Sequence, residues 1–167
     1  MSPIDRKLYF AYGSNMNDEQ MAFRCPDAEA VGTVRLEGYR LAFCGKGGRG
    51  VATILPEAGS HVDGVLWHIS AADEKSLDRY EGYPFLYTKE TLPVSCKDGS
   101  EVSVMAYVMT APSRDIPAKP SPSYLNGILE GCRQHGVNGR PILDAAFQSA
   151  KAQFLAPAPK KQRGQER

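Results

Sequence analysis

Glu81 is the residue best placed for acid–base chemistry. A helix is expected from Ser70 to Gly82, because serine is a preferred N-cap and glycine suits the C-cap. Glu81 then falls in the last turn, where the helix dipole disfavours a carboxylate. Tyr80 and Tyr83 flank it with large apolar bodies, so we expect a raised pKa and a candidate general base. The alternative is an exposed glutamate at a helix end.

A second candidate is the segment Tyr12-Gly13-Ser14-Asn15, which follows a short aromatic strand expected at 8–12. Glycine lets backbone approach a ligand closely, and successive N–H groups at such a turn form an anion-binding concavity. The alternative is an ordinary turn from strand to helix. Ser14 is poorly supported as a nucleophile, because the GxSxG pattern is absent.

Other patterns carry less chemistry. Gly45, Gly47 and Gly50 match GxGxxG, but a strand-like segment follows where the dinucleotide fingerprint needs a helix, so a flexible hairpin loop is favoured. The four cysteines form no CxxC pair, which favours reduced thiols over a disulfide framework. The scattered histidines lack metal-ligand spacing, so no metal site is expected.

Hydrophobic patterning predicts the elements that must position these residues. Helices are expected at 70–82, 123–135 and 141–154, and Asn17 is a good cap for a short helix that Pro26 ends. The apolar face of 141–154 is predicted to carry Ile142, Leu143, Ala146 and Phe147. Strands are expected at 8–12, 30–36, 39–44, 51–55, 63–69, 87–94 and 102–109.

This order of many strands and few, late helices predicts the fold class. Regular alternation of strand and helix, typical of a parallel sheet, is missing. We therefore predict an α+β fold, a small mixed β-barrel with flanking helices.

Length and composition set the outer limits. The 167 residues fit one domain, predicted at 1–155, with a polar and basic disordered tail at 156–167. A net charge of +1 gives no reason to expect a nucleic-acid partner. No apolar run approaches the roughly 20 residues of a membrane helix, and the start lacks a hydrophobic signal core. We expect a soluble cytoplasmic protein without a membrane partner.

Several motifs occur together in a known family. The run Tyr9-Phe10-Ala11-Tyr12-Gly13-Ser14-Asn15 resembles the signature strand and loop of the γ-glutamylcyclotransferases, including AIG2-like proteins. The similarity continues through 50–54, 64–67 and 77–82, then Tyr87 and the segment 120–124, and covers roughly residues 7–150 in order.

The resemblance implies a fold, an activity and a set of site residues. Family members have a small mixed barrel with flanking helices and cyclise the γ-glutamyl group of γ-glutamyl amino acids, releasing 5-oxoproline and the free amino acid. The family's catalytic glutamate falls on Glu81. Its substrate-binding residues fall on Tyr9, Phe10, Ala11, Tyr12, Gly13, Ser14, Tyr87 and Tyr124. The reaction is an intramolecular aminolysis that needs no cofactor and no metal, and the resemblance suggests a homodimer.

Other functions stay open from the residues. The Gly82-Tyr83-Pro84 run is more similar to relatives that act on other γ-glutamyl amines, so an amine or γ-glutamylated metabolite is an alternative substrate. A non-catalytic small-ligand-binding module on the same fold is an alternative of another class, and a nucleotide-binding protein is a third.

Overall fold

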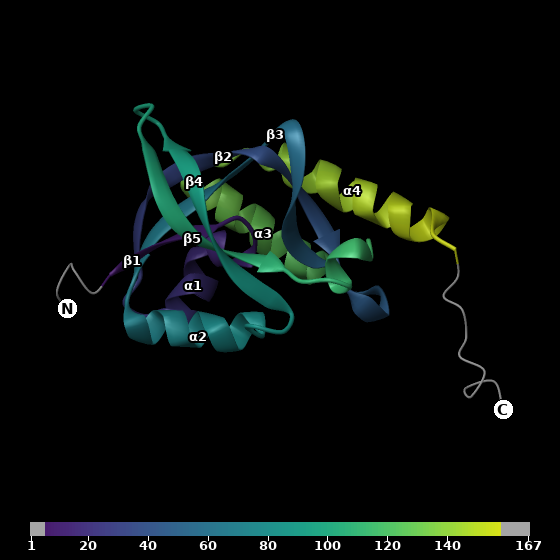
Figure 1. Cartoon of the computed structure of the whole chain (residues 1–167), viewed down its shortest axis with the longest axis horizontal. Helices are drawn as coiled ribbons and strands as arrows, with labels where there is room; N and C mark the ends of the chain where they lie inside the picture. The colour runs from purple at the N-terminus through teal and green to yellow at the C-terminus, as the bar shows by residue number, and fades with distance from the viewer. Residues whose placement is uncertain (1–5, 158–167) are drawn as a thin grey trace.

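Five strands close into one barrel in this computed structural model, which describes residues 6–157 (Figure 1). Around the barrel the strand order is β1-β3-β2-β4-β5; β1 and β5 pair in parallel and the other neighbours pair antiparallel. The predicted mixed barrel is thus confirmed. In chain order the elements are β1 Lys7–Ala11, η2 Ser14–Met16, α1 Asp18–Arg24, β2 Glu29–Cys44, η3 Lys46–Gly48, β3 Val51–Ile69, α2 Ala71–Glu81, β4 Tyr87–Cys96, β5 Glu101–Met109, η4 Ser113–Asp115, α3 Pro122–His135 and α4 Arg140–Leu155.

The strands β2 and β3 are longer than predicted. Each joins two segments that the sequence pattern separates, and together they form one long antiparallel hairpin. Gly38, at φ +83°, marks a register shift between Glu37 and Tyr39 that bends β2 without ending it. The strand predicted after the glycine-rich loop is confirmed, because β3 begins at Val51.

Two helices pack against the barrel from the later part of the chain. Gly131 of α3 lies so close to the Met16–Asn17 backbone that an added Cβ would meet it at 2.7 Å, and this close approach brings α3 against η2. The helix α4 packs on β2 through Ile142, Ala145 and Ser149, and the Ser149 hydroxyl accepts a hydrogen bond from the N–H of Phe43.

The predicted apolar face of α4 is partly wrong. Leu143 is 46% exposed and Phe147 is 66% exposed, whereas Ile142 and Ala145 are buried. The helix is apolar around more of its circumference than its contact with β2 uses, so periodicity alone did not identify the face against the barrel.

Two further sequence predictions concern the ends of the chain and membranes. The tail predicted to be disordered lies, from residue 158 onward, outside the described residues. Within residues 6–157, none of the helices combines the length and the apolar character that crossing a membrane requires.

Candidate active site

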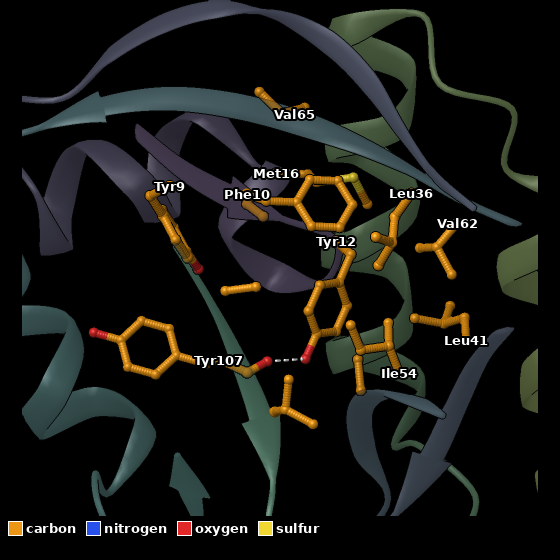
Figure 2. Packing of buried hydrophobic residues seen from close by; sticks show 14 of the residues in the cluster. Tyr9, Phe10, Tyr12, Met16, Leu36, Leu41, Ile54, Val62, Val65 and Tyr107 are labelled. Atoms are coloured by element: carbon orange, nitrogen blue, oxygen red, sulfur yellow. Dashed lines mark hydrogen bonds between the residues drawn. The ribbon is translucent and has the colours of Figure 1, made fainter. Parts of the chain in front are cut away.

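The end of β1 and the turn after it carry the first group of site residues. Tyr9 and Phe10 point to different sides of β1, as strand geometry requires: Tyr9 faces Tyr107, whereas Phe10 lies among Met16 and Leu36 (Figure 2). The Tyr12 hydroxyl donates a hydrogen bond to the backbone oxygen of Tyr107, which fixes the start of the turn against β5.

The turn leaves backbone donors free. Ser14–Met16 forms a single 3₁₀ turn, closed by the N–H of Met16 donating to the oxygen of Gly13 at 3.0 Å. Among the described residues, the N–H groups of Gly13, Ser14 and Asn15 donate to no protein acceptor, because the first donors of a helical turn lack an internal partner. These groups can serve an anion.

Glu81 ends α2 as predicted. The helix begins with a capping box, in which the Ser70 hydroxyl accepts from the N–H of Asp73 and the Asp73 carboxylate accepts from the N–H of Ser70. It stops because Gly82 adopts a left-handed conformation at φ +65°. Glu81 therefore lies in the last turn of a helix that is fixed at both ends.

A small ion-pair network ties α2 to the barrel next to the site. The Lys89 ammonium lies 2.7 Å from a Glu74 oxygen and 2.9 Å from an Asp78 oxygen. Asp78 also accepts a hydrogen bond from the Tyr107 hydroxyl at 2.6 Å. Because Asp78 lies one turn before Glu81, the same contacts that hold Tyr107 also hold the end of α2.

Two tyrosines hold β3 at the floor of the site. The N–H of Ala52 donates to the Tyr124 hydroxyl oxygen at 2.9 Å, and the Tyr87 hydroxyl donates to the oxygen of Ala52 at 2.6 Å. Because the Tyr124 oxygen accepts here, its own proton is left to donate to a bound molecule. The Tyr87 proton is already used.

These segments converge on a cavity of about 200 Å³. It is lined by Tyr9, Tyr12, Gly13, Ser14, Asn15, Val51, Ala52, Tyr80, Glu81, Leu86, Tyr87, Tyr107 and Tyr124. Glu81 is the charged residue in this lining, all of which belongs to the described part of the chain. A cavity of this size fits a small molecule of a few functional groups rather than a polymer.

Burial controls the protonation of the lining. It raises the pKa of Glu81 to about 7, and the positive charge of Arg24 acts in the opposite direction. Within residues 6–157, no protein group donates a hydrogen bond to the Glu81 carboxyl, so its oxygens are left for a bound molecule. Burial also raises the pKa of five lining tyrosines, which are therefore neutral near pH 7: Tyr9, Tyr12, Tyr87, Tyr107 and Tyr124.

The structure brings together most of the residues singled out in the sequence. Glu81, Tyr9, Tyr12, Gly13, Ser14, Tyr87 and Tyr124 all line the cavity. Phe10 and Ala11 do not: both are fully buried outside the lining, Phe10 on the opposite side of β1 from Tyr9 and Ala11 where β1 pairs with Val65 of β3. Their assignment as substrate-binding residues stays a prediction.

Several lining residues were missed. Tyr107 lies on β5, whose residues 104–109 are buried on both faces, so its pattern resembles that of any core position. Asn15 and Tyr80 were within the quoted motifs but were not assigned to the site. Val51 and Ala52 reach the site only through the fold of the long hairpin.

Comparison with known proteins gives a consistent result. Residues 9–126 match the family model for gamma-glutamyl cyclotransferase, AIG2-like. Over 138 residues, covering 78% of this chain and 72% of each relative, the chain is 34% identical to the gamma-glutamylcyclotransferase of Bos taurus and 33% identical to that of Homo sapiens. A solved structure of a gamma-glutamyl cyclotransferase is similar at a TM-score of 0.72, with 30% identity and 96% of each chain covered.

Proposed function

This chain belongs to the gamma-glutamyl cyclotransferase, AIG2-like family, and from that premise we propose how it acts. It is a γ-glutamylcyclotransferase that converts the γ-glutamyl group of γ-glutamyl amino acids to 5-oxoproline and releases the free amino acid. Glu81 is the general base and then the general acid. The observation that carries this role is the half-buried Glu81 carboxyl, free of protein partners, in the cavity that also holds Gly13 and Ser14.

The substrate contains both reacting groups. Its α-amine attacks its own γ-carbonyl carbon, so a C–N bond forms and closes a five-membered lactam. Glu81 takes the proton that the ammonium form of this amine must lose before it attacks; a second proton leaves the same nitrogen as the lactam forms and ends, through solvent, on the released amine. The tetrahedral intermediate then collapses, the original γ-amide C–N bond breaks, and protonated Glu81 gives the proton to the departing nitrogen. One carboxyl moves one proton between two nitrogens, a role worth about 10²–10⁴-fold in rate.

The raised pKa suits Glu81 to this exchange. An α-amine has a pKa of about 8, whereas an ordinary glutamate has a pKa of about 4.3. Moving a proton from the ammonium to such a glutamate therefore costs roughly 5 kcal/mol. With the pKa of Glu81 at about 7, this cost falls to about 1 kcal/mol. The carboxyl can therefore accept and return the proton with little free-energy difference between the two states.

Two parts of the cavity position the substrate: the turn at Gly13 and Ser14, called here the glycine-serine bend, and the lining tyrosines. The free N–H groups of Gly13 and Ser14 bind an anion, either the substrate's α-carboxylate or the oxyanion of the intermediate. The Tyr124 hydroxyl, held by Ala52, donates to the folded glutamyl chain. Holding amine and carbonyl in contact contributes through near-attack geometry.

One observation favours a second substrate class. The cavity lining, which lies wholly within the described residues, carries no lysine or arginine to pair with the carboxylate of a departing amino acid. A γ-glutamyl amine, which has no carboxylate on its leaving group, is therefore the alternative substrate.

A substrate panel with mass detection of 5-oxoproline tests the reaction. The purified enzyme is given γ-glutamyl-alanine, γ-glutamyl-ethylamine and glutathione. Release of 5-oxoproline from the first identifies the proposed substrate class, and release from the second alone identifies the amine class. Binding seen by thermal shift without any release would indicate a non-catalytic module.

The Glu81→Gln variant tests the base. We expect it to keep the fold and to bind γ-glutamyl-alanine but to lose at least about 10²-fold in turnover, because the amide accepts no proton at neutral pH. Glu90→Gln, an exposed charge removal on β4, is the matched control and should leave turnover unchanged. Near-normal release by Glu81→Gln removes Glu81 from its role.

We also propose that the enzyme works in the cytoplasm as a homodimer. All four cysteines carry free thiols, and three of them are buried, as expected in a reducing compartment. The exposed apolar side chains of α4 support a second copy as the partner, since two-fold homodimers are the commonest soluble assemblies.

A further inference from the structure

Arg24, the last residue of α1, links two parts of the active site without lining the cavity. Its Nη1 donates to the Asn15 side-chain oxygen at 2.6 Å, and its Nη2 donates to the Gln20 side-chain oxygen at 3.0 Å. Its guanidinium carbon lies 3.6 Å from the centre of the Tyr80 ring. The planar group is thus fixed by hydrogen bonds at its edge and by an aromatic ring on its face.

The partners of Arg24 are themselves tied to the reacting groups. Asn15 donates to the Tyr9 hydroxyl at 3.0 Å, and the Tyr80 hydroxyl lies 3.1 Å from the Ser14 hydroxyl. Tyr80 directly precedes Glu81. One side chain of α1 therefore connects the glycine-serine bend with the end of α2, two segments more than sixty residues apart in the chain.

Arg24 also supplies the positive charge that acts on the Glu81 carboxyl. Its charge opposes the larger effect of burial on the pKa of Glu81. One turn earlier on α2, Asp78 is paired with Lys89 and hydrogen-bonded by Tyr107. The titratable groups that face Glu81 from the surrounding elements are Tyr9, Tyr12, Tyr80, Tyr87, Tyr107 and Tyr124.

We propose that Arg24 is a positioning residue, which holds the end of α2 against the glycine-serine bend and keeps the Glu81 carboxyl under a fixed positive charge. This inference rests on the proposed function, because it gives Arg24 its role through Glu81. It adds a residue that does not itself line the cavity.

The contacts require arginine rather than any cation. A guanidinium is planar, stacks on an aromatic face and presents several N–H donors in a fixed arrangement. A lysine at position 24 keeps the charge but loses the stacked plane and one of the two hydrogen bonds. The two parts of the proposed role can therefore be separated by substitution.

The first experiment measures the pKa of Glu81 directly, by ¹³C NMR titration of carboxyl-labelled glutamate. The Glu81 signal is assigned by its loss in Glu81→Gln. We expect Arg24→Met to raise the Glu81 pKa by about one pH unit, because an opposite charge is removed, and Arg24→Lys to leave it close to the wild-type value. This readout does not depend on turnover, so it tests the charge even if the chain has no cyclotransferase activity.

The second experiment measures kcat and kcat/KM for γ-glutamyl-alanine between pH 5 and pH 9. At pH values below the pKa of Glu81, kcat/KM falls about tenfold for each unit that the pH decreases, because the base is protonated. This part of the profile is its acidic limb. We expect Arg24→Met to move this acidic limb upward by about one pH unit, which lowers the rate at pH 6 by about tenfold more than at pH 9. Arg24→Lys should keep the limb in place and lower kcat at every pH, because the bend and α2 are no longer held together.

The matched control is Arg79→Met, which removes an exposed arginine from the end of α2 whose described side-chain hydrogen bond is to Ser76. It should change neither the limb nor kcat. Thermal unfolding followed by circular dichroism confirms that each variant is folded at the assay temperature.

The outcomes separate the two proposals. The role of Arg24 is overturned if the Glu81 pKa is unchanged in folded Arg24→Met. It is also overturned if both Arg24 variants lose activity equally at all pH values and the acidic limb does not move. In either case, wild-type turnover still supports the proposed function. Absence of 5-oxoproline release by the wild-type enzyme overturns the proposed function instead.

Discussion

At the scale of single residues, Glu81 combines catalytic suitability with a cost in stability. A carboxyl whose pKa is raised by burial is a good proton carrier near pH 7, but its charged form is disfavoured in the folded state. Active sites often contain such locally unfavourable groups. The same raised pKa therefore has a thermodynamic consequence that can be measured without substrate.

The pH dependence of stability follows with a definite sign. The pKa of Glu81 is raised from 4.5 to about 7, so between these values the folded state holds a proton that the unfolded state releases. This contribution to stability is complete below about pH 4.5 and is lost as pH rises through about 7. It amounts to at most about 3 kcal/mol. Because glutamine does not titrate, we expect the Glu81→Gln variant not to lose this stability as the pH rises.

Urea unfolding of the wild type and Glu81→Gln at pH 4.5 and pH 8 measures the difference. The variant should gain in relative stability by about 2–3 kcal/mol on going from the lower to the higher pH. Glu90→Gln, with an exposed carboxyl, should show no such gain. Parallel pH profiles for Glu81→Gln and the wild type would contradict a buried, proton-holding carboxyl.

At the scale of elements, α2 supports Glu81, the proposed catalytic group. It is anchored at its start by the Ser70–Asp73 capping box, in its middle by the fully buried Leu77, and near its end by the ion pair between Asp78 and Lys89. The Ser70 hydroxyl also donates to an Asp27 oxygen at 2.8 Å. The start of α2 is therefore tied to the segment after α1.

Removing the cap should lower stability more than activity. We expect Ser70→Ala to lower the free energy of unfolding by about 1–2 kcal/mol, because the N–H of Asp73 and the Asp27 carboxylate each lose a partner. Turnover well below the melting temperature should stay near the wild-type value, since Ser70 lies at the opposite end of α2 from Glu81.

Urea denaturation and turnover at 25 °C check this pair of expectations. Ser76→Ala, on the same helix but outside the cap, is the control and should change stability by only a few tenths of a kcal/mol. A large loss of turnover in folded Ser70→Ala would show that the cap acts on the site directly.

At the scale of the whole molecule, the outer face of α4 is the surface through which we propose that two copies associate. Leu143, Phe147 and Phe154 recur at helical spacing and are all exposed, while the opposite face packs on β2. Figure 1 shows α4 running along the outside of the barrel and extending past it toward the C-terminal end of the chain. The apolar stripe formed by Leu143, Phe147 and Phe154 is therefore accessible to a second copy of the chain.

We expect the wild type to be a dimer and Phe147→Glu to shift it toward the monomer, because a charge placed in an apolar interface is costly to bury. Size-exclusion chromatography with light scattering over a hundredfold range of concentration measures both. Gln148→Glu, a neighbouring position on the same helix, adds the same charge to a different face and is the control. A wild type that is monomeric throughout would contradict the homodimer.

Much of the molecule could be predicted from local sequence signals. The caps at Asn17, Ser70 and Gly82 are confirmed, because each depends on a side chain or glycine and its immediate neighbours. The α+β barrel class follows from the count and order of strands. The motif residues identified Glu81 and the glycine-serine bend as parts of one site.

Other features depend on contacts between distant segments. Whether Gly38 ends a strand or bends it depends on β3 pairing across it, and whether Phe147 is buried depends on how much of α4 the barrel covers. Arg24 and Tyr107 belong to the site's surroundings only because α1, α2 and β5 meet there. Sequence fixes such side chains on a face of their own element but not the neighbour that face will meet.

The amino-acid sequence by itself thus indicated the groups available for chemistry, one carboxyl at a helix end and a glycine-containing turn, and its family resemblance implied a reaction without a protein nucleophile. The tertiary structure decided how that carboxyl behaves. Its pKa reflects the loss of water around it, and that loss is produced by tyrosines from β1, α2, β4, β5 and α3. Burial is a property of the closed barrel and its helices, so no local pattern of residues could supply it.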